Sequence, residues 1–253
     1  MDTAEHAATL LLDAWAAPAR PLAALPEALR PRDERGMYAI QAAVRRGLGP
    51  NGGWKVGRPG PESPYFCAPM PASRIQPTPG LLPAAFYTLR GVEAEIAFRL
   101  GADLPPRPEP WPRDAVLAAI ASCHPAIEVL QSRFADPDAL DKLTALADGN
   151  AHGGFIFGTP IEGWREEDFP SMGVRLIVNG DVVKTGRGNP AGDMIAMIAW
   201  LAGPGGAFTG GLHAGDFITC GSWTGKTLVA PGARVEVAFD GAGPVVAEFV
   251  DEA

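Results

Sequence analysis

Apolar residues near the start of the chain repeat with a helical period. Within residues 4–16 they recur at three- and four-residue steps, at Ala8, Leu11, Leu12 and Trp15. This spacing predicts an amphipathic helix, which Pro18 and Pro21 end. A second helix is predicted from Asp33 to about Leu48. Residues 1–52 are therefore expected to be a mainly helical N-terminal subregion.

Alternation of apolar and polar residues predicts strands farther along the chain. Val92–Leu100 is the longest such segment, and shorter strands are predicted at 126–130, 154–158, 217–220, 234–239 and 245–250. Asn179-Gly180 separates two further strands, 174–178 and 181–185, and this dipeptide suits the type I′ turn of a hairpin. The C-terminal half is therefore predicted to be mostly antiparallel β-structure.

The remaining segments carry different signals. Helical composition marks residues 114–123, and another helix is predicted from Asn189-Pro190 to Leu201, with Asn189 as N-cap. The Gly- and Pro-rich stretch between 48 and 93 is predicted to be irregular. The chain has no internal repeat and no regular strand–helix alternation. This disfavours a doubly wound sheet and a (β/α)₈ barrel.

Composition narrows the class of protein. Of the 253 residues, 47% are hydrophobic and 20% are charged, which predicts a globular protein with a packed core and no membrane span. The net charge of −8 and the lack of a basic run argue against nucleic acid as a partner. Cys67, Cys123 and Cys220 are widely spaced and include no CxxC pair, which argues against a disulfide framework or a zinc site. With an acidic N-terminus unlike a secretory signal, these features predict a cytoplasmic location.

Three glutamates carry the strongest chemical signal. Glu93 and Glu95 are two positions apart on a predicted strand, so they project to one face at roughly 6–7 Å. Glu128 lies in an apolar strand, where an ionised carboxylate needs a compensating cation or donor. One interpretation is a solvated strand face together with an ion pair between Glu128 and Arg133. The other is an all-oxygen ligand set for Mg²⁺ or Mn²⁺.

Further polar residues lie in apolar or Gly-rich surroundings. Lys55 is flanked by apolar and small residues, where burial would lower its pKa and suit it for proton transfer. Asp148, Asn150 and His152 share a flexible turn before a strand, as substrate-binding residues often do. Ser222 and Thr224 lie in a Gly-bracketed turn and are candidates to hydrogen-bond a substrate carboxylate.

Several segments, in order, resemble one family over most of the chain. The similar segments are Met37–Gln41, Gly53–Gly57, Val92–Phe98, Ala126–Glu128, Ser132-Arg133, Gly188–Pro190, Ala199–Ala202, Ala214–Asp216 and Gly221–Gly225. In these segments the chain resembles the 2-keto-4-pentenoate hydratase/2-oxohex-3-enedioate decarboxylase group of the fumarylacetoacetate hydrolase superfamily. Glu128 fits this branch, because the carbon–carbon hydrolase branch usually has aspartate as the third metal ligand.

The resemblance implies a fold and a set of site residues. The fold is α+β and β-rich, a twisted mixed sheet closed into a roll with peripheral helices, like the fumarylacetoacetate hydrolase C-terminal domain. The chain would form a single catalytic domain, 1–253, in a homo-oligomer. Glu93, Glu95 and Glu128 match the metal ligands, and Lys55 matches the active-site lysine.

Two segments depart from the family pattern. Hydratases of the group have an acid in a Pro-Asp-(aromatic)-Gly segment, whereas this chain reads Ser63-Pro64-Tyr65-Phe66-Cys67. The loop usually written Ala-Asp-Asn-Ala-Ser lacks its serine here and is followed by His152. Tyr65 and His152 are therefore hypothesised to take over proton transfer. The missing acid weakens the case for hydration more than the case for decarboxylation.

The resulting expectation is a divalent-metal-dependent lyase of aromatic-compound catabolism. It would hydrate or decarboxylate a small 2-oxo or 2-hydroxydienoic acid, such as 2-hydroxypenta-2,4-dienoate or 2-oxohex-3-enedioate. One alternative is an acylpyruvate-type carbon–carbon hydrolase or an oxaloacetate decarboxylase/tautomerase, with His6 or His152 as base in the hydrolase. Another is a non-catalytic metal-binding homologue.

Overall fold

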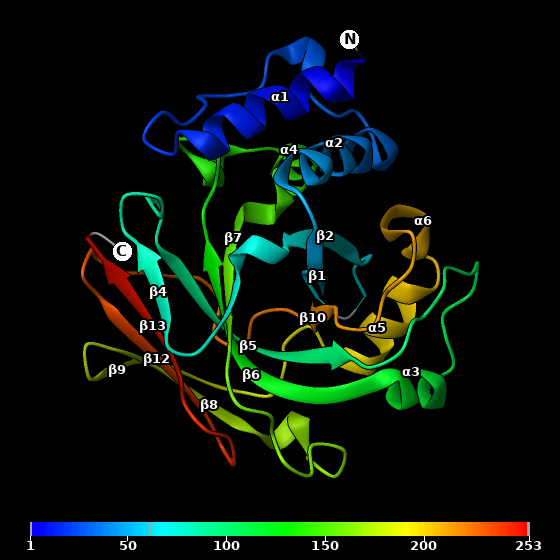
Figure 1. The fold of residues 1–253 in the computed structure, drawn as a ribbon, viewed down its shortest axis with the longest axis vertical. Helices are drawn as coiled ribbons and strands as arrows, with labels where there is room; N and C mark the ends of the chain where they lie inside the picture. The colour runs from blue at the N-terminus through cyan, green and yellow to red at the C-terminus, as the bar shows by residue number, and fades with distance from the viewer. Residues whose placement is uncertain (1, 61, 252–253) are drawn as a thin grey trace.

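Two β-sheets form the body of the molecule, which is a computed structural model describing residues 2–60 and 62–251 (Figure 1). The larger sheet has eight strands in the order β2-β1-β10-β5-β6-β7-β3, and β11 also pairs with β5. Its strands are β1 (Asn51–Gly57), β2 (Phe66–Pro71), β3 (Ile75–Pro77), β5 (Gly91–Leu100), β6 (Ile120–Leu130), β7 (His152–Phe157), β10 (Phe217–Thr219) and β11 (Thr227–Leu228). Antiparallel and parallel pairs are mixed, since β1 runs parallel to β10 and β3 parallel to β7.

The smaller sheet has five strands in the order β4-β13-β12-β8-β9. They are β4 (Gly80–Pro83), β8 (Gly173–Val178), β9 (Asp181–Arg187), β12 (Arg234–Phe239) and β13 (Val245–Val250). β12 and β13 contact β6, which joins the two sheets through a common core. The expected hairpin is confirmed, because Asn179 and Gly180 both have positive φ angles, 52° and 93°, between β8 and β9.

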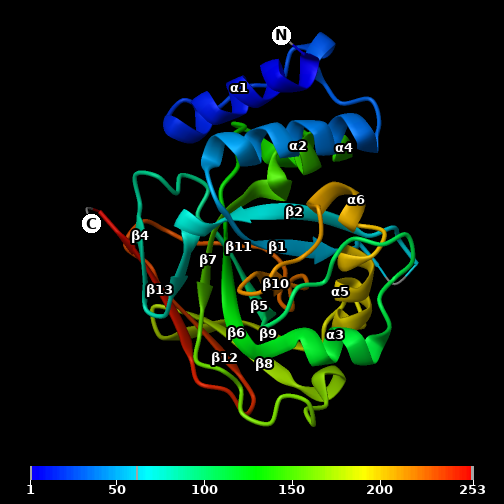
Figure 2. The same cartoon turned by 45° about the vertical axis from the view of Figure 1, so that its right-hand side comes forward.

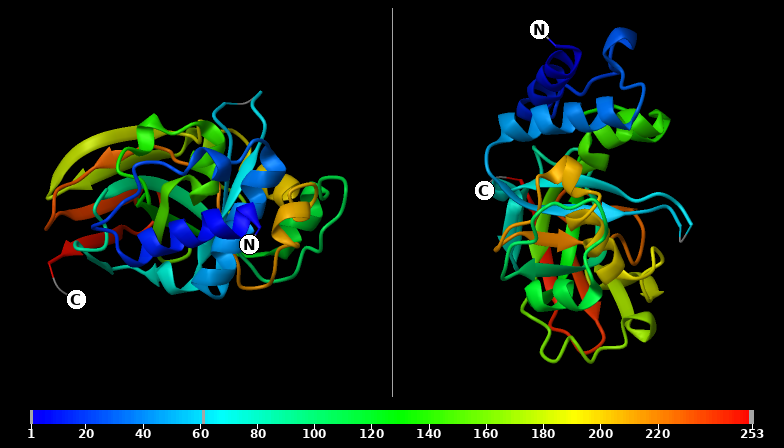
Figure 3. Two further views of the ribbon diagram at one scale, coloured as in Figure 1. Left: turned by 90° about the horizontal axis from the view of Figure 1, so that it is seen from above. Right: turned by 90° about the vertical axis from the view of Figure 1, so that its right-hand side faces the viewer.

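Helices cover two sides of the sheets (Figures 2 and 3). α1 (Thr3–Ala16), α2 (Glu34–Leu48) and α4 (Lys142–Ala147) form a layer beyond one end of the larger sheet. α3 (Arg113–Ala119), α5 (Met194–Ala202) and α6 (Gly206–Thr209) lie together at another side, where α5 contacts β1. Short 3₁₀ turns are η1 (Glu27–Leu29), η2 (Ala72–Arg74), η3 (Pro137–Ala139), η4 (Gly149–Ala151) and η5 (Phe169–Ser171).

Most predicted elements are confirmed, including both N-terminal helices and the strands of the C-terminal half. The prediction of irregular structure between 48 and 93 is wrong, because β1 to β4 all lie there. Three of these strands, β2, β3 and β4, contain prolines, which argue against a strand in the sequence. All three are edge strands, where a missing N–H is tolerated. Glycines hid β1. At Gly53 an added Cβ would lie 2.1 Å from the carbonyl oxygen of Phe217 in β10, so only glycine permits this approach.

Two helix boundaries also differ from the prediction. Helical structure ends at Ala119 instead of continuing to 123, because the following residues pair with β5 as the start of β6. The helix expected from Asn189 begins at Met194, and its N-cap is Asp193, whose carboxylate accepts bonds from two backbone N–H groups. Gly192 has φ 96°, which no α-helical residue adopts, so a helix cannot run from Asn189 through Gly192.

Two statements about the whole fold follow. The fold is mixed α and β as predicted, but among the described strands neither sheet closes on itself, so the expected closure into a roll is not confirmed. No helix in the described ranges is both long and apolar enough to cross a membrane.

Candidate metal centre

The three predicted carboxylates meet at the centre of the larger sheet. β5 and β6 pair in a register that places Glu93 opposite Glu128, while Glu95 lies two residues farther along the same face. One carboxylate oxygen from each of the three residues lies within 4.8 Å of the others. Glu95 is 1% exposed and Glu128 is fully buried, so the alternative of a solvated strand face is wrong.

Such a cluster is unfavourable without a cation. Burial and the charge of Glu128 raise the pKa of Glu93 to about 7, and burial with both neighbouring glutamates raises the pKa of Glu95 well above its usual range. Glu128 Oε2 is buried and has no hydrogen-bond partner among the described residues. Three hard oxygen donors, one of them unsatisfied, fit Mg²⁺ or Mn²⁺ better than zinc. The residues present therefore suit the predicted metal.

Lys55 lies beside this cluster on β1. Its Nζ donates to Glu128 Oε1 at 2.5 Å and to the backbone carbonyl of Asn150 at 3.3 Å. The expected lowering of its pKa is wrong. Burial does lower the pKa, but the negative charges of Glu128, Glu93 and Glu95 outweigh burial and raise it. Lys55 is therefore an ammonium group at neutral pH, and it holds the pKa of Glu128 low, at about 2.

A cavity of about 320 Å³ opens onto Lys55 and the three glutamates. Asn150 and Ser222 also line it, as two of the predicted substrate-binding residues. The Ser222 oxygen accepts a bond from the backbone N–H of Gly225 at 2.8 Å, which leaves its own O–H available to a ligand. Thr224 does not line the cavity. Its hydroxyl oxygen instead accepts from the backbone N–H of Ala94 at 3.2 Å.

His152 lies behind the cluster and does not line the cavity. Its Nδ1 is 2.9 Å from Glu128 Oε1, and the side chain is 2% exposed. Burial lowers the pKa of its imidazole, so the ring is neutral and donates to the carboxylate. The structure thus places His152 against Glu128, outside the lining of the cavity. Its predicted role in proton transfer stays a prediction that this position does not support.

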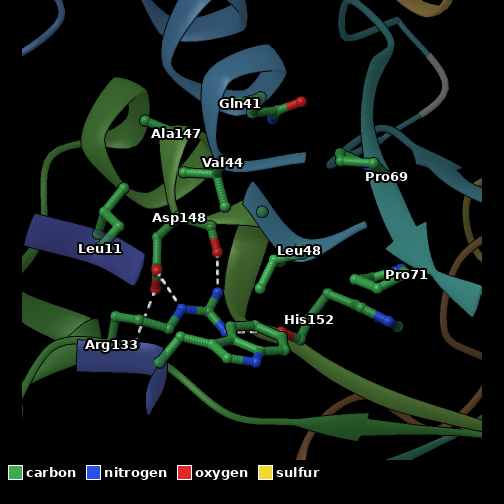
Figure 4. Close-up of a pocket in the computed structure, with 12 residues that line it drawn as sticks. Leu11, Gln41, Val44, Leu48, Pro69, Pro71, Arg133, Ala147, Asp148 and His152 are labelled. Carbon is green, nitrogen blue, oxygen red and sulfur yellow. Dashed lines mark hydrogen bonds and ion pairs between the residues drawn. The ribbon is translucent and has the colours of Figure 1, made fainter. Parts of the chain in front are cut away.

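The loop that carries Asn150 and His152 is fixed by Arg133. This guanidinium is paired with the buried carboxylate of Asp148 and donates to the carbonyl oxygen of His152 at 2.7 Å (Figure 4). It also donates to the carbonyl oxygen of Gln131 at 2.6 Å. Asn150 has φ 51°, a left-handed conformation that asparagine tolerates better than most residues. The proposed ion pair between Arg133 and Glu128 is therefore wrong. Arg133 binds Asp148, and Lys55 binds Glu128.

Asp148 accordingly faces Arg133 and the Ser132 hydroxyl, which donates to it at 2.8 Å, and it does not line the cavity of the glutamates. Tyr65 is also outside that lining. Its ring centroid is 5.2 Å from that of Trp200, while the next residue, Phe66, lines the cavity. The structure therefore does not bring Asp148 or Tyr65 together with the carboxylates.

Sequence reasoning missed two residues of the site. Thr219 on β10 is buried and its hydroxyl donates to Glu95 Oε2, but a threonine in a short apolar strand gives no signal of this. Arg58 lines the cavity just after β1. Its position three residues beyond Lys55 is a signal by which it could have been found.

Comparison with known proteins defines the family. The model of the fumarylacetoacetate (FAA) hydrolase C-terminal family matches residues 53–250, so the chain belongs to this family. 4-Oxalocrotonate decarboxylase of Pseudomonas putida is 32% identical over 136 residues, which cover 53% of this chain and about half (51%) of that relative. 2-Keto-4-pentenoate hydratase 2 of Dechloromonas aromatica (strain RCB) is 28% identical over 260 residues, 97% of each chain.

A solved structure is similar over nearly the whole chain. The 4-oxalocrotonate decarboxylase of Pseudomonas putida G7, complexed with magnesium and adipate, has a TM-score of 0.85 at 25% identity and covers 98% of this chain and 97% of its own. The resemblance seen in the sequence motifs is thus confirmed. The relatives' names describe lyases, which agrees with the expected hydratase or decarboxylase and not with a carbon–carbon hydrolase. The magnesium agrees with the predicted metal.

Proposed function

We propose that this protein is a Mg²⁺- or Mn²⁺-dependent lyase acting on a small 2-oxo or 2-hydroxydienoic acid. One observation carries this proposal: three clustered carboxylates and a buried ammonium group line the same cavity. The names of the family members that match the chain support the same reaction class. Glu93, Glu95 and Glu128 would hold the cation.

The chain's own groups have separate tasks in this reaction. A bound divalent cation would polarise the oxygens at carbons 1 and 2 of the substrate. The Lys55 ammonium lies at the same wall and stabilises negative charge that develops on the oxygen at carbon 2, to which it can donate a proton. Ser222 lines the cavity, and its O–H would donate to the substrate carboxylate. Thr219 and His152 fix Glu95 and Glu128, so the ligands are preorganised.

Between the two lyase reactions, the lining of the cavity favours decarboxylation. Addition of water requires a base that activates it. Among the described residues that line the cavity, the carboxyl groups are the three glutamates, and these are the metal ligands. Tyr65 and His152, the candidates to replace the missing acid, both lie outside the lining. Decarboxylation needs charge stabilisation on the oxygen at carbon 2 and no activated water.

Turnover of two substrates tests the proposal. The protein with Mg²⁺ is incubated with 2-oxohex-3-enedioate or with 2-hydroxypenta-2,4-dienoate, and the products are identified by mass, with and without a chelator. We expect chelator-sensitive loss of carbon dioxide from the first compound to be faster than water addition to the second. Absence of a chelator-sensitive product from both compounds would overturn the proposed function.

We also propose a homo-oligomer, a cytoplasmic location and a single catalytic domain. Exposed apolar side chains on the edge strands β4 and β9, namely Leu81, Val182 and Val183, support a homo-oligomer, which sedimentation analysis can measure. The three cysteines are buried thiols, in agreement with a reducing cytoplasm. One catalytic domain, with residues 1–52 as a helical subregion, is supported by the core that α1 and α2 share with the sheets.

A further inference from the structure

Arg58 lies in the metal-site cavity at a position set apart from Lys55. It directly follows β1, and among the described residues that line this cavity the basic ones are Lys55 and Arg58. Three residues of extended chain span roughly 10 Å. Because the backbone at Arg58 lies that far along the cavity from Lys55, the distal part of an extended ligand held at the glutamates is the part expected to reach Arg58.

The guanidinium of Arg58 is held in place on several sides. Its Nε donates to the carbonyl oxygen of Ala191 at 2.9 Å, and its Cζ lies 4.8 Å from the ring centroid of Tyr65. Tyr65 in turn packs on Trp200 of α5. At Gly192 an added Cβ would come within 3.1 Å of Nη2, so the absence of a side chain there leaves room for the guanidinium. Tyr65, which was predicted to be catalytic, thus packs against Arg58 and helps to hold its guanidinium in place.

A fixed, planar guanidinium in the lining of an acid-binding cavity has a specific chemical preference. Guanidinium groups bind carboxylates with two parallel hydrogen bonds, and they remain charged at all physiological pH values. We propose that Arg58 binds the distal carboxylate of the substrate and so selects dicarboxylic 2-oxo acids over monocarboxylic ones. This inference rests on the proposed function, and it narrows the substrate class of that same cavity.

The chemistry of decarboxylation gives this assignment a distinctive kinetic consequence. In a six-carbon 2-oxo-3-ene dioic acid the bond between carbons 5 and 6 breaks, and carbon 6 leaves as carbon dioxide. The bonding electrons move through the conjugated chain to the oxygen at carbon 2, which then takes up a proton. Carbon 6 loses its charge in this step, so Arg58 binds the ground state more strongly than the transition state. Removing Arg58 should raise KM without lowering kcat.

Binding of unreactive acids tests the role of Arg58 without turnover. Isothermal titration calorimetry of the Mg²⁺-loaded protein compares adipate with hexanoate, which lacks the second carboxylate. We expect the wild type to prefer adipate by roughly tenfold or more, as for hydrogen bonds between charged groups. In Arg58→Gln the affinity for adipate should fall to that for hexanoate, and Arg58→Lys should be intermediate. Arg187→Gln, outside this cavity, is the matched control.

The outcomes separate this inference from the proposed function. Equal affinities of the wild type for both acids, no adipate binding, or an equal loss for both acids in Arg58→Gln would overturn the role of Arg58 even if turnover is found. Preference for adipate that depends on Arg58 would support it even if no substrate is turned over. With turnover, a higher KM and an unchanged or higher kcat for 2-oxohex-3-enedioate in Arg58→Gln are expected. A lower kcat with unchanged KM would contradict it.

Discussion

The two sheets differ in where they carry charged residues: the smaller sheet has them on its outer face, and the larger sheet buries them. In β12 and β13 of the smaller sheet, buried and more exposed positions alternate, and Arg234 pairs with Glu236 and Glu248 on the outer face at 3.0 and 3.4 Å. In β5 and β6 of the larger sheet both faces are covered, and Glu95 and Glu128 are buried. Charges on the outer face remain hydrated, so their pairing contributes little. Charges in the larger sheet lack water and must be compensated.

Buried charge marks where function can be expected in this fold. A buried carboxylate costs several kcal/mol unless a cation or donors accompany it, so such groups persist where their chemistry is used. The larger sheet gathers Lys55, Thr219 and His152 around its glutamates, one from each of three further strands. The smaller sheet contributes mainly apolar side chains to one side of the hydrophobic core. Paired substitutions in the two sheets therefore test the comparison directly.

The largest effect is expected from Glu128→Gln, compared with Glu236→Gln. The first substitution removes a charged metal ligand and the partner of Lys55, so metal-dependent turnover should fall about a thousandfold or more, at the upper end of the loss seen when one electrostatic group of an active site is removed. Turnover should be unchanged in Glu236→Gln. Steady-state kinetics with circular dichroism as a folding control provides the measurement. Activity within tenfold of wild type in Glu128→Gln would contradict the assignment.

A large loss of stability is expected from Arg133→Met, compared with Arg234→Met. The first change leaves the buried Asp148 carboxylate without its cation, which should lower the free energy of unfolding by about 3–5 kcal/mol. Arg234 pairs at the surface, so its loss should cost less than about 1 kcal/mol. Urea denaturation measures both values. Similar losses in the two variants would show that burial does not determine the cost of losing an ion pair in this protein. Arg133→Lys, which retains the charge, serves if Arg133→Met does not fold.

The affinity for Mg²⁺ should rise with pH up to about 7. Between the ordinary value of 4.5 and its folded pKa of about 7, Glu93 holds a proton in the metal-free protein, and this proton must leave when the cation binds. Affinity should therefore fall by about tenfold for each pH unit below 7 for each proton released. Calorimetric titration with Mg²⁺ at pH 5.5, 6.5 and 7.5 measures this. Glu93→Gln should weaken the dependence without removing it, because the raised pKa of Glu95 couples a second proton to Mg²⁺ binding. A pH-independent affinity of the wild type would contradict the prediction.

The smallest effects concern packing. Ile127→Val removes one methylene from a fully buried position of β6 and should lower the free energy of unfolding by about 0.5–1.5 kcal/mol. Val183→Ala on β9, where the side chain is 45% exposed, should change it by less than about 0.5 kcal/mol. Chemical denaturation of the two variants checks the order. A larger loss in Val183→Ala would indicate that β9 is covered by a partner in solution.

Local sequence patterns determined a large part of the fold. Helical periodicity defined α1 and α2, alternation defined β5, β12 and β13, and Asn179-Gly180 defined the hairpin, because each signal depends on neighbouring residues. The same alternation placed Glu93 and Glu95 on one face. The isolated charges of Glu128 and Lys55 in apolar segments marked them as candidates, because an uncompensated buried charge is costly.

Tertiary structure alone decided the features that depend on residues distant in the chain. The register of β5 and β6 brought Glu128 opposite Glu93, and pairing with β10 made the Gly-rich residues 51–57 into the strand that carries Lys55. Packing also determined which ion pairs form among residues of the same charge. Lys55 pairs with Glu128, and Arg133 pairs with Asp148. Composition and spacing cannot distinguish such pairs, because the free energy of each ion pair depends on burial and distance, and both are set only when the strands meet.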